Sequence, residues 1–121
     1  YDLRFPEQFR AMVPEAEIFI IPANWPAARA SHWKALLAAR AIENQCYVAG
    51  VNCCGSMDDQ YYSGDSGIYA PDGSLLAPVK ETRLWDSCME ETLLVYDIQN
   101  DVAKIRKAFP VLQDRKEMKR S

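Results

Sequence analysis

Apolar residues recur at helical spacing in two stretches of the first half of the chain. Residues 6–13 carry a short apolar stripe and begin with a proline, which is tolerated at the first position of a helix. Residues 27–45 are rich in alanine and repeat their apolar residues at intervals of three and four, which favours a longer helix. We also predict a third helix over residues 102–109, capped by Asn100 or Asp101.

Between and after these helices lie short runs of β-branched and aromatic residues that predict strands. Residues 18–21 (IFII) are apolar without interruption, a pattern typical of a strand covered on both faces. Residues 46–52 (CYVAGVN) predict a second strand, and the alternation of helix and strand in this half indicates an α/β fold. The strands predicted in the second half are residues 68–70, 75–79 and 92–98.

Polar and turn-forming residues punctuate the second half of the chain. Residues 55–67 (GSMDDQYYSGDSG) predict a long polar loop. The sequence PDGS at residues 71–74 predicts a turn that joins two strands as a hairpin, because proline presets φ and glycine tolerates positive φ. No repeat or domain boundary is evident. The apolar faces exceed what these elements can bury among themselves, so we expect more sheet to belong to the fold.

The charge balance and the hydrophobic pattern disfavour two classes of partner. The chain has 14 Lys and Arg against 17 Asp and Glu, a net charge of −3. Nucleic-acid-binding surfaces are usually basic stripes, so no nucleic-acid partner is expected. The basic residues at 115–120 are mixed with acidic ones, which is typical of a solvated tail, with a partner-binding arm as the alternative. No apolar run approaches the roughly 20 residues that a membrane span needs, so no membrane partner is expected.

The four cysteines and the single histidine offer little metal chemistry. Cys46, Cys53, Cys54 and Cys88 show no CxxC spacing, and a zinc site needs three or four converging ligands. The chain is also unlike short, cysteine-dense secreted domains, so we expect free thiols in a reducing cytoplasm and no metal site. A nucleophilic pair of one cysteine with His32 is possible chemistry, although a histidine on a helix face is more often structural.

Five short tracts stand out in order along the chain: YDLRFPE (1–7), PANWP (22–26), HWKALLAARAIENQCYVAGVN (32–52), YSGDS (62–66) and PDG (71–73). In this order and spacing they resemble the nitrilase superfamily of carbon–nitrogen hydrolases, nearest to its ω-amidase branch. The resemblance runs from Tyr1 to about Asp114. It implies half of a four-layer α-β-β-α sandwich, with residues 1–121 forming the C-terminal part of a single hydrolase domain.

The resemblance also implies where the nucleophile lies. In the family the first tract reads CYDLRFPE and its cysteine is the nucleophile, so this cysteine is expected immediately before Tyr1. A nucleophile at a sharp turn from strand to helix directs the next backbone N–H toward the oxyanion. We therefore expect the Tyr1 amide to stabilise the oxyanion. The family's general-base glutamate and its lysine lie upstream of the cysteine and are expected outside residues 1–121.

Further site residues follow from the same resemblance. Asn24 and Trp25, on the proline-flanked loop after the first strand, are expected to line the acyl pocket, with pure packing as the alternative. Arg29 is a candidate to bind the distal carboxylate of a substrate, because a guanidinium suits bidentate carboxylate recognition. The alternative for Arg29 is a solvated helix face.

Three residues of the first tract are expected to support the site. Asp2 can accept backbone N–H bonds in the turn. Arg4 and Glu7, three residues apart, are expected to form an ion pair that steadies the turn; the alternatives for Arg4 are substrate contact or ordinary surface pairing. Farther along, Arg40 with its neighbours Glu43 and Asn44 is expected to be a buried polar anchor.

The function implied by the resemblance is that of an amidase. It would cleave a small ω-amide of a dicarboxylic or 2-oxo acid through a cysteine thioester, releasing ammonia and using no cofactor. The implied protein is a cytoplasmic homodimer whose partner is a small-molecule amide. Two alternatives stay open: another hydrolase of the superfamily, acting on a nitrile or an N-carbamoyl group, or a non-catalytic fragment or scaffold without the triad.

Overall fold

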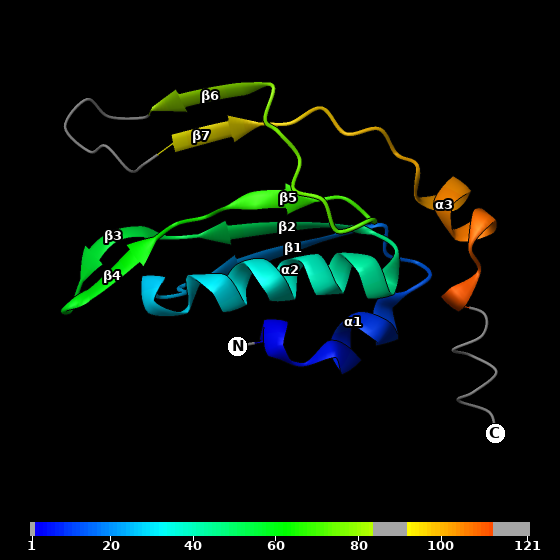
Figure 1. Cartoon of the computed structure of the whole chain (residues 1–121), viewed down its shortest axis with the longest axis horizontal. Helices are drawn as coiled ribbons and strands as arrows, with labels where there is room; N and C mark the ends of the chain where they lie inside the picture. Colours follow the sequence, from blue (N-terminus) through cyan, green and yellow to red (C-terminus); the bar gives the residue numbers. More distant parts are fainter. Residues whose placement is uncertain (1, 84–91, 113–121) are drawn as a thin grey trace.

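A helix packed along one face of a three-stranded sheet forms the centre of the structure, a computed structural model that describes residues 2–83 and 92–112 (Figure 1). The helix is α2 (Ala30–Asn44). The strands are β1 (Ile18–Ala23), β2 (Tyr47–Asn52) and β5 (Gly67–Tyr69), in the order β1-β2-β5. Strand β1 is parallel to β2, and β5 is antiparallel to β2. The predicted α/β class is confirmed.

Shorter elements surround this centre. They are η1 (Asp2–Arg4), α1 (Pro6–Met12), η2 (Ala27–Arg29), β3 (Cys54–Met57), β4 (Gln60–Ser63), β6 (Lys80–Arg83), β7 (Thr92–Val95) and α3 (Val102–Ala108). The three predicted helices are confirmed to within a few residues, although the Asp101 cap makes no side-chain hydrogen bond. None of the described helices combines the length and apolar character needed to cross a membrane.

Two predictions for the second half were wrong. The expected polar loop 55–67 contains the β3–β4 hairpin, in which Met57 pairs with Gln60 around a two-residue turn. Both turn residues, Asp58 and Asp59, have positive φ (49° and 64°), as a type I′ hairpin turn requires. The expected strand 75–79 is reduced to a single bridge between Tyr69 and Leu75.

Helix α2 lies close to the sheet because β2 offers no side chain at Gly50. Trp33 and Leu37 are fully buried there. A Cβ atom at Gly50 would lie 2.7 Å from Leu37 Cδ1 and 2.7 Å from Trp33 Cζ2, distances that real Cβ contacts do not show. The glycine is therefore needed for the close approach of the helix to the strand.

The buried Arg40 ties α2 to the first turn of the chain. Its Nε donates to the Leu3 carbonyl at 3.0 Å, and its Nη1 lies 3.3 Å from Glu43 Oε1. Asn44, also buried, donates to the Arg40 carbonyl at 3.0 Å. The predicted polar anchor is thus confirmed, and it holds η1 against the helix. Burying a guanidinium is tolerated because these partners replace its hydration.

Arg106 anchors α3 to other segments by hydrogen bonds, as Arg40 anchors α2. Its guanidinium donates to the carbonyls of Pro14 (2.8 Å), Ala16 (2.9 Å) and Asn44 (3.1 Å). One side chain thereby joins three segments that are distant in sequence. Such charge-assisted bonds are stronger than neutral ones, so Arg106 stabilises the docking of the C-terminal helix.

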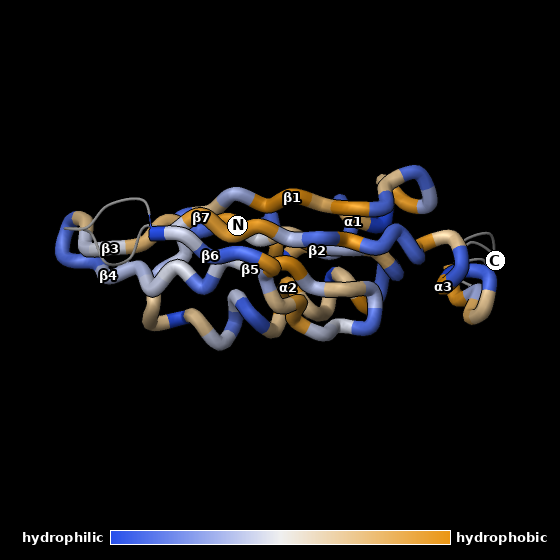
Figure 2. Tube along the Cα trace, turned by 90° about the horizontal axis from the view of Figure 1, so that it is seen from above, coloured by the Kyte–Doolittle hydropathy of each residue, from blue (hydrophilic) through white to orange (hydrophobic). Residues whose placement is uncertain are grey.

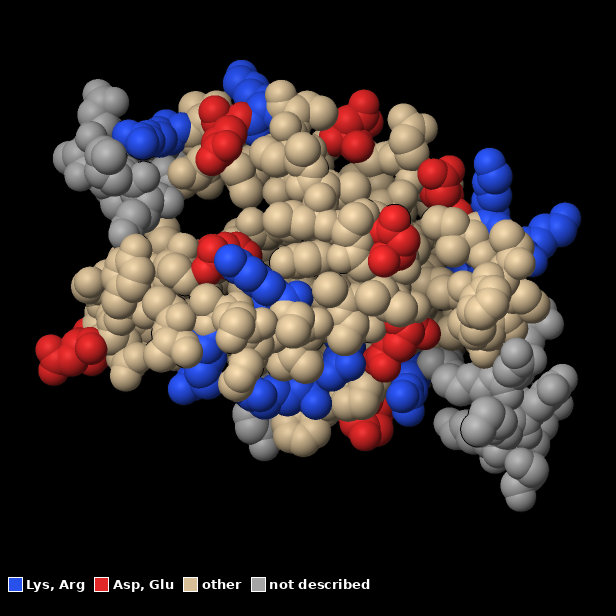
Figure 3. All heavy atoms as spheres, viewed as in Figure 1, with Lys and Arg blue, Asp and Glu red and all other residues tan. Residues whose placement is uncertain are grey.

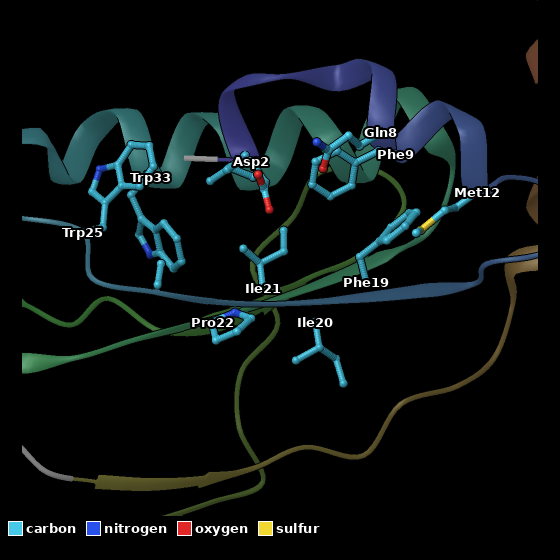
Figure 4. Close-up of a pocket in the computed structure, with 12 residues that line it drawn as sticks. Asp2, Gln8, Phe9, Met12, Phe19, Ile20, Ile21, Pro22, Trp25 and Trp33 are labelled. Carbon is cyan, nitrogen blue, oxygen red and sulfur yellow. The ribbon is translucent and has the colours of Figure 1, made fainter.

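The second face of the sheet is apolar; Tyr47 and Ala49 of β2 are buried on it, whereas β1 and the end of β2 are exposed. Figure 4 shows Phe19 and Ile21 of β1 on the side of the helices, with Ile20 on the opposite side. Ile20 is 69% exposed, and Val51 of β2 is 52% exposed. Strand β1 is hydrophobic along most of its length (Figure 2). The two-sided burial expected for residues 18–21 is therefore met on one face only within the described residues.

We expect Gly50→Ala to lower the free energy of unfolding by about 1–3 kcal/mol, because the added methyl group forces α2 away from β2. Chemical denaturation of the protein measures this change. Leu37→Ala removes part of the clash, so the double variant should lose less stability than the sum of the two single variants. Strict additivity would contradict the close contact.

Candidate active site

The carboxyl ends of the parallel strands β1 and β2 form an open edge of the sheet. Asn24 follows β1 directly, and Asn52 ends β2. An open cavity of about 560 Å³ lies at this edge. Its lining residues are Pro22, Ala23, Asn24, Val51, Asn52 and Cys53. Ligands of open α/β sheets bind outside the carboxyl ends of the strands, so this edge is the candidate active site.

Trp25 is the buried centre of the loop after β1. Its side chain is only 6% exposed, and its indole Nε1 donates to the Arg29 carbonyl at 2.7 Å. Its ring lies 5.6 Å from that of Trp33, centroid to centroid. The guanidinium carbon of Arg4 lies 4.9 Å from the Trp25 ring, within the range of a cation–π contact. Trp25 thus connects the loop to η1.

Arg4 does not pair with Glu7 in the described part of the chain. Besides the Trp25 ring, the Arg4 guanidinium contacts His32 on α2, with Nη2 3.5 Å from Nδ1. The predicted ion pair between Arg4 and Glu7 is therefore wrong as a contact. The physical reason is that the guanidinium gains an aromatic face on one side and a ring nitrogen on the other.

A second cavity, of about 360 Å³, lies between β1 and the helical segment that precedes it. Figure 4 shows the Asp2 carboxylate directed toward Ile21, with Phe9 and Phe19 farther along the cavity. Most of the lining is apolar, with Asp2 and Gln8 as the polar exceptions. The Asp2 carboxylate thus faces an apolar cavity next to the first turn of the chain.

Comparison with protein families decides the identity of this fold. The family model described as carbon-nitrogen hydrolase matches residues 1–107. The chain belongs to the carbon–nitrogen hydrolase family. The expected resemblance is therefore confirmed.

Relatives within the carbon–nitrogen hydrolase family carry ω-amidase names. The chain is 41% identical over 116 residues to the 2-oxoglutaramate amidase of Bacillus subtilis, covering 94% of this chain and 42% of that protein. It is 42% identical over 118 residues to the ω-amidase YafV of Yersinia enterocolitica, again covering 94% and 42%. The chain therefore spans less than half the length of these curated relatives.

Solved structures of the family agree with the fold. A CN-hydrolase superfamily protein of Xanthomonas campestris with an arsenic adduct in its active site matches with a TM-score of 0.77 and 34% identity. The match covers 94% of this chain and 43% of that one. An amidase from Nesterenkonia sp. matches with a TM-score of 0.63 and 28% identity, covering 89% and 38%.

The structure brings some of the predicted site residues together and separates others. Asn24 lines the cavity at the open edge, whereas the buried Trp25, in the same loop, lines the second cavity. Arg29 lies exposed on η2, with its carbonyl bound to Trp25. Glu7 lies exposed on α1. Figure 3 shows basic side chains along the lower edge of the molecule, with acidic side chains among them. Tyr1 lies outside the described residues, as do Cys88 and the 115–120 tail.

The geometry does not support a nucleophilic pair of Cys46 with His32. Cys46 is fully buried just before β2, and His32 lies near Arg4 on the outside of α2. Burial raises the pKa of the Cys46 thiol to about 12, with Arg106 opposing and Glu43 adding to the shift. The thiol is therefore protonated at neutral pH and cannot act as a nucleophile. Within residues 2–83 and 92–112, no group of three or more His, Cys, Asp or Glu side chains is arranged to hold a metal ion.

Sequence reasoning missed Asn52 as a site residue. Its backbone continues the parallel pairing with β1, where it lies opposite Ala23. Its side-chain amide bonds to the backbone of Trp25 in both directions. The signal was available in part: a polar residue at the end of an apolar strand, at the same edge as PANWP, points to the carboxyl edge of the sheet.

Cys46 should resist alkylation in the folded protein at pH 8, whereas the half-buried Cys53 should react with iodoacetamide. Mass spectrometry of proteolytic peptides distinguishes the two sites. Labelling in denaturant, where both thiols should react, is the control. Equal labelling of both thiols in the folded protein would contradict the burial of Cys46.

The same thiol adds a pH dependence to stability. Between pH 9 and pH 12 the unfolded chain releases the Cys46 proton, while the folded protein retains it. The free energy of unfolding should therefore fall as pH rises through this window. Below the window Cys46 is protonated in both states and adds no pH dependence. In Cys46→Ala, measured by the same denaturation series, this component of the slope should be absent.

Proposed function

We propose that the protein containing this chain is an amidase that hydrolyses the ω-amide of a small dicarboxylic or 2-oxo acid and releases ammonia. The observation that carries this proposal is the 41–42% identity, over 94% of the chain, to relatives named 2-oxoglutaramate amidase and ω-amidase. Membership of the carbon–nitrogen hydrolase family alone supports only the broader class of reaction.

We further propose that residues 1–121 are the C-terminal part of a single two-sheet domain. The matched relatives are more than twice as long as the matched region. The sheet face opposite α2 exposes Ile20 and Val51, which supports a second sheet packed against it. Two sheets that stack face to face with helices outside form the expected four-layer sandwich.

The proposed mechanism uses a cysteine immediately before Tyr1. The family's glutamate takes the proton of the cysteine thiol, the thiolate attacks the amide carbon, and the developing oxyanion accepts a hydrogen bond from the Tyr1 amide and a contact from the family's lysine. The C–N bond then breaks, and the amide nitrogen leaves as ammonia with the proton that the glutamate took from the thiol. The same glutamate next deprotonates a water molecule that attacks the thioester; the C–S bond breaks, the acid is released and the cysteine regains its proton. Each well-aimed oxyanion donor is worth about 3 kcal/mol in such reactions.

The residues of this chain would serve mainly in binding and support. Asn24 and Trp25, on the loop at the carboxyl end of β1, would form one wall of the acyl pocket. Asp2 and Arg4 would hold the turn, Arg4 through its contact with Trp25. The negative charge of Glu7, at the start of α1, would stabilise the N-terminus of that helix.

We propose a cytoplasmic location and a homodimeric state for the protein. Within the described residues, Cys46 and Cys53 form no disulfide, which supports a reducing cytoplasm. A homodimer follows from the family resemblance alone. Sedimentation of the complete enzyme measures the oligomeric state directly.

The covalent route predicts an acyl adduct in the complete enzyme. Rapid mixing with 2-oxoglutaramate, followed by acid quench and intact-mass analysis, should show a mass increase equal to the acyl group, accompanied by a burst of ammonia. The control is a variant with alanine at the position before Tyr1, which should show neither signal. Hydrolysis of a nitrile or an N-carbamoyl substrate in place of the amide, or no reaction at all, would contradict the proposal.

Arg29 is proposed to bind the distal carboxylate, so Arg29→Ala should raise the KM for 2-oxoglutaramate about tenfold or more. A tenfold rise corresponds to a loss of ~1.4 kcal/mol of binding free energy. Hydrolysis of pentanamide, which lacks that carboxylate, should be unaffected. Lys34→Ala is the matched control, because Lys34 is a neighbouring cation that already pairs with Asp65 at 3.6 Å. Equal effects on both substrates would place Arg29 outside the pocket.

A further inference from the structure

Five hydrogen bonds converge on Asn52 at the carboxyl end of β2. Its Oδ1 accepts the Trp25 N–H at 2.7 Å, and its Nδ2 donates to the Trp25 carbonyl at 2.9 Å. Nδ2 also donates to the Gly64 carbonyl at 2.9 Å. The backbone N–H of Asn52 donates to Ser66 Oγ at 2.8 Å, and this hydroxyl lies 3.3 Å from the Asn52 carbonyl.

The pair of bonds to Trp25 extends the sheet by means of a side chain. Strand β1 ends at Ala23, opposite Asn52 in the parallel register. Beyond this point the loop turns away, and no strand pairs with Trp25 in the described ladder. The amide of Asn52 supplies one acceptor and one donor to the Trp25 backbone, as a neighbouring strand would. The free donors and acceptors of a partly buried loop are thereby satisfied.

Only asparagine among side chains of this length can make these bonds at once. A carboxylate accepts but cannot donate to the carbonyls of Trp25 and Gly64, and a hydroxyl has a single donor. The turn that holds Gly64 has the matching geometry, since Gly64 has a φ of 78°. The same turn binds Trp33, whose Nε1 donates to the Asp65 carbonyl at 2.8 Å.

We call the two side-chain bonds from Asn52 to the Trp25 backbone the clamp. The clamp is connected to the first turn of the chain by the Trp25 ring. With its backbone fixed by Asn52 and its Nε1 by Arg29, this ring is held at both ends. Its face carries the Arg4 guanidinium at 4.9 Å, and Arg4 belongs to η1. A contiguous set of contacts therefore runs from Asn52 through Trp25 to the segment that follows the proposed nucleophile.

We infer that Asn52 is a positioning residue, whose side-chain amide fixes the Trp25 backbone and thereby the wall of the acyl pocket and the turn after the nucleophile. This inference rests on the proposed function for its effect on catalysis. The clamp itself, however, is a property of the described chain and can be measured without substrate.

The first measurement is amide hydrogen exchange in the complete enzyme. In Asn52→Ala the Trp25 amide should exchange about tenfold faster, because it loses its only acceptor in the described chain. Asn52→Asp keeps the acceptor and should change this exchange less. The matched control is Gln45→Ala. Gln45 lies just before β2, at the end opposite to Asn52, and its side-chain amide donates to the Phe109 carbonyl. This variant should leave the Trp25 amide unchanged.

The second measurement is steady-state hydrolysis of 2-oxoglutaramate. The kcat is calculated per active site, and the concentration of active sites is taken from the size of the acyl burst. Asn52→Ala should lower kcat about tenfold to hundredfold, because small displacements of reacting groups have effects of this size. Gln45→Ala should leave kcat per active site unchanged. Asn52→Asp should lie between the wild type and Asn52→Ala, since it retains one of the two bonds to Trp25.

The two readouts separate the possible failures. Unchanged exchange at Trp25 in Asn52→Ala overturns the clamp, whatever the activity. Faster exchange with unchanged kcat overturns the positioning role and leaves the proposed amidase intact. Faster Trp25 exchange in a protein that hydrolyses no amide, with the wild type equally inactive, overturns the proposed function and leaves the clamp standing.

Discussion

The close approach of α2 to β2 at Gly50 determines how the segments around the helix are held. Because no Cβ intervenes, Trp33 and Leu37 reach the backbone of the strand and bury themselves completely. The burial of two large side chains at one point fixes both the rotation and the height of the helix above the sheet. That height lets Arg40 reach the Leu3 carbonyl and lets Trp33 reach the Asp65 carbonyl.

The candidate site is a consequence of this packing. One side of α2 holds η1 through Arg40, and the N-terminal end of the helix holds the turn after β4 through Trp33. The loop after β1 is held between these two segments, with Trp25 in contact with Arg4 and bound by Asn52. Polar bonds thus hold a loop at the carboxyl edge of a rigid sheet, the arrangement by which α/β folds support binding sites.

The pattern of apolar residues predicted the helices and strands that show a clear periodicity or an unbroken apolar run. The periodicity of residues 27–45 and the apolar run 18–21 found α2 and β1, and the tract order found the family. The β3–β4 hairpin was missed because its Asp58-Asp59 turn and polar strands read as a loop. The family resemblance and the spacing of three residues paired Arg4 with Glu7, whereas the contacts of Arg4 with Trp25 and His32 depend on tertiary packing. Asn52 was missed for the same reason, since its partners lie 12 to 27 residues away.

A crystal structure of the complete enzyme, trapped with an acyl group from an ω-amide, would show where the reacting carbon lies. We expect the acyl carbon at the carboxyl ends of β1 and β2, beside the 24–25 loop, with its oxygen within hydrogen-bond distance of the Tyr1 amide. An acyl group bound elsewhere, or a Tyr1 amide paired in a regular ladder with no cavity beside it, would show that this edge of the sheet is not the active site.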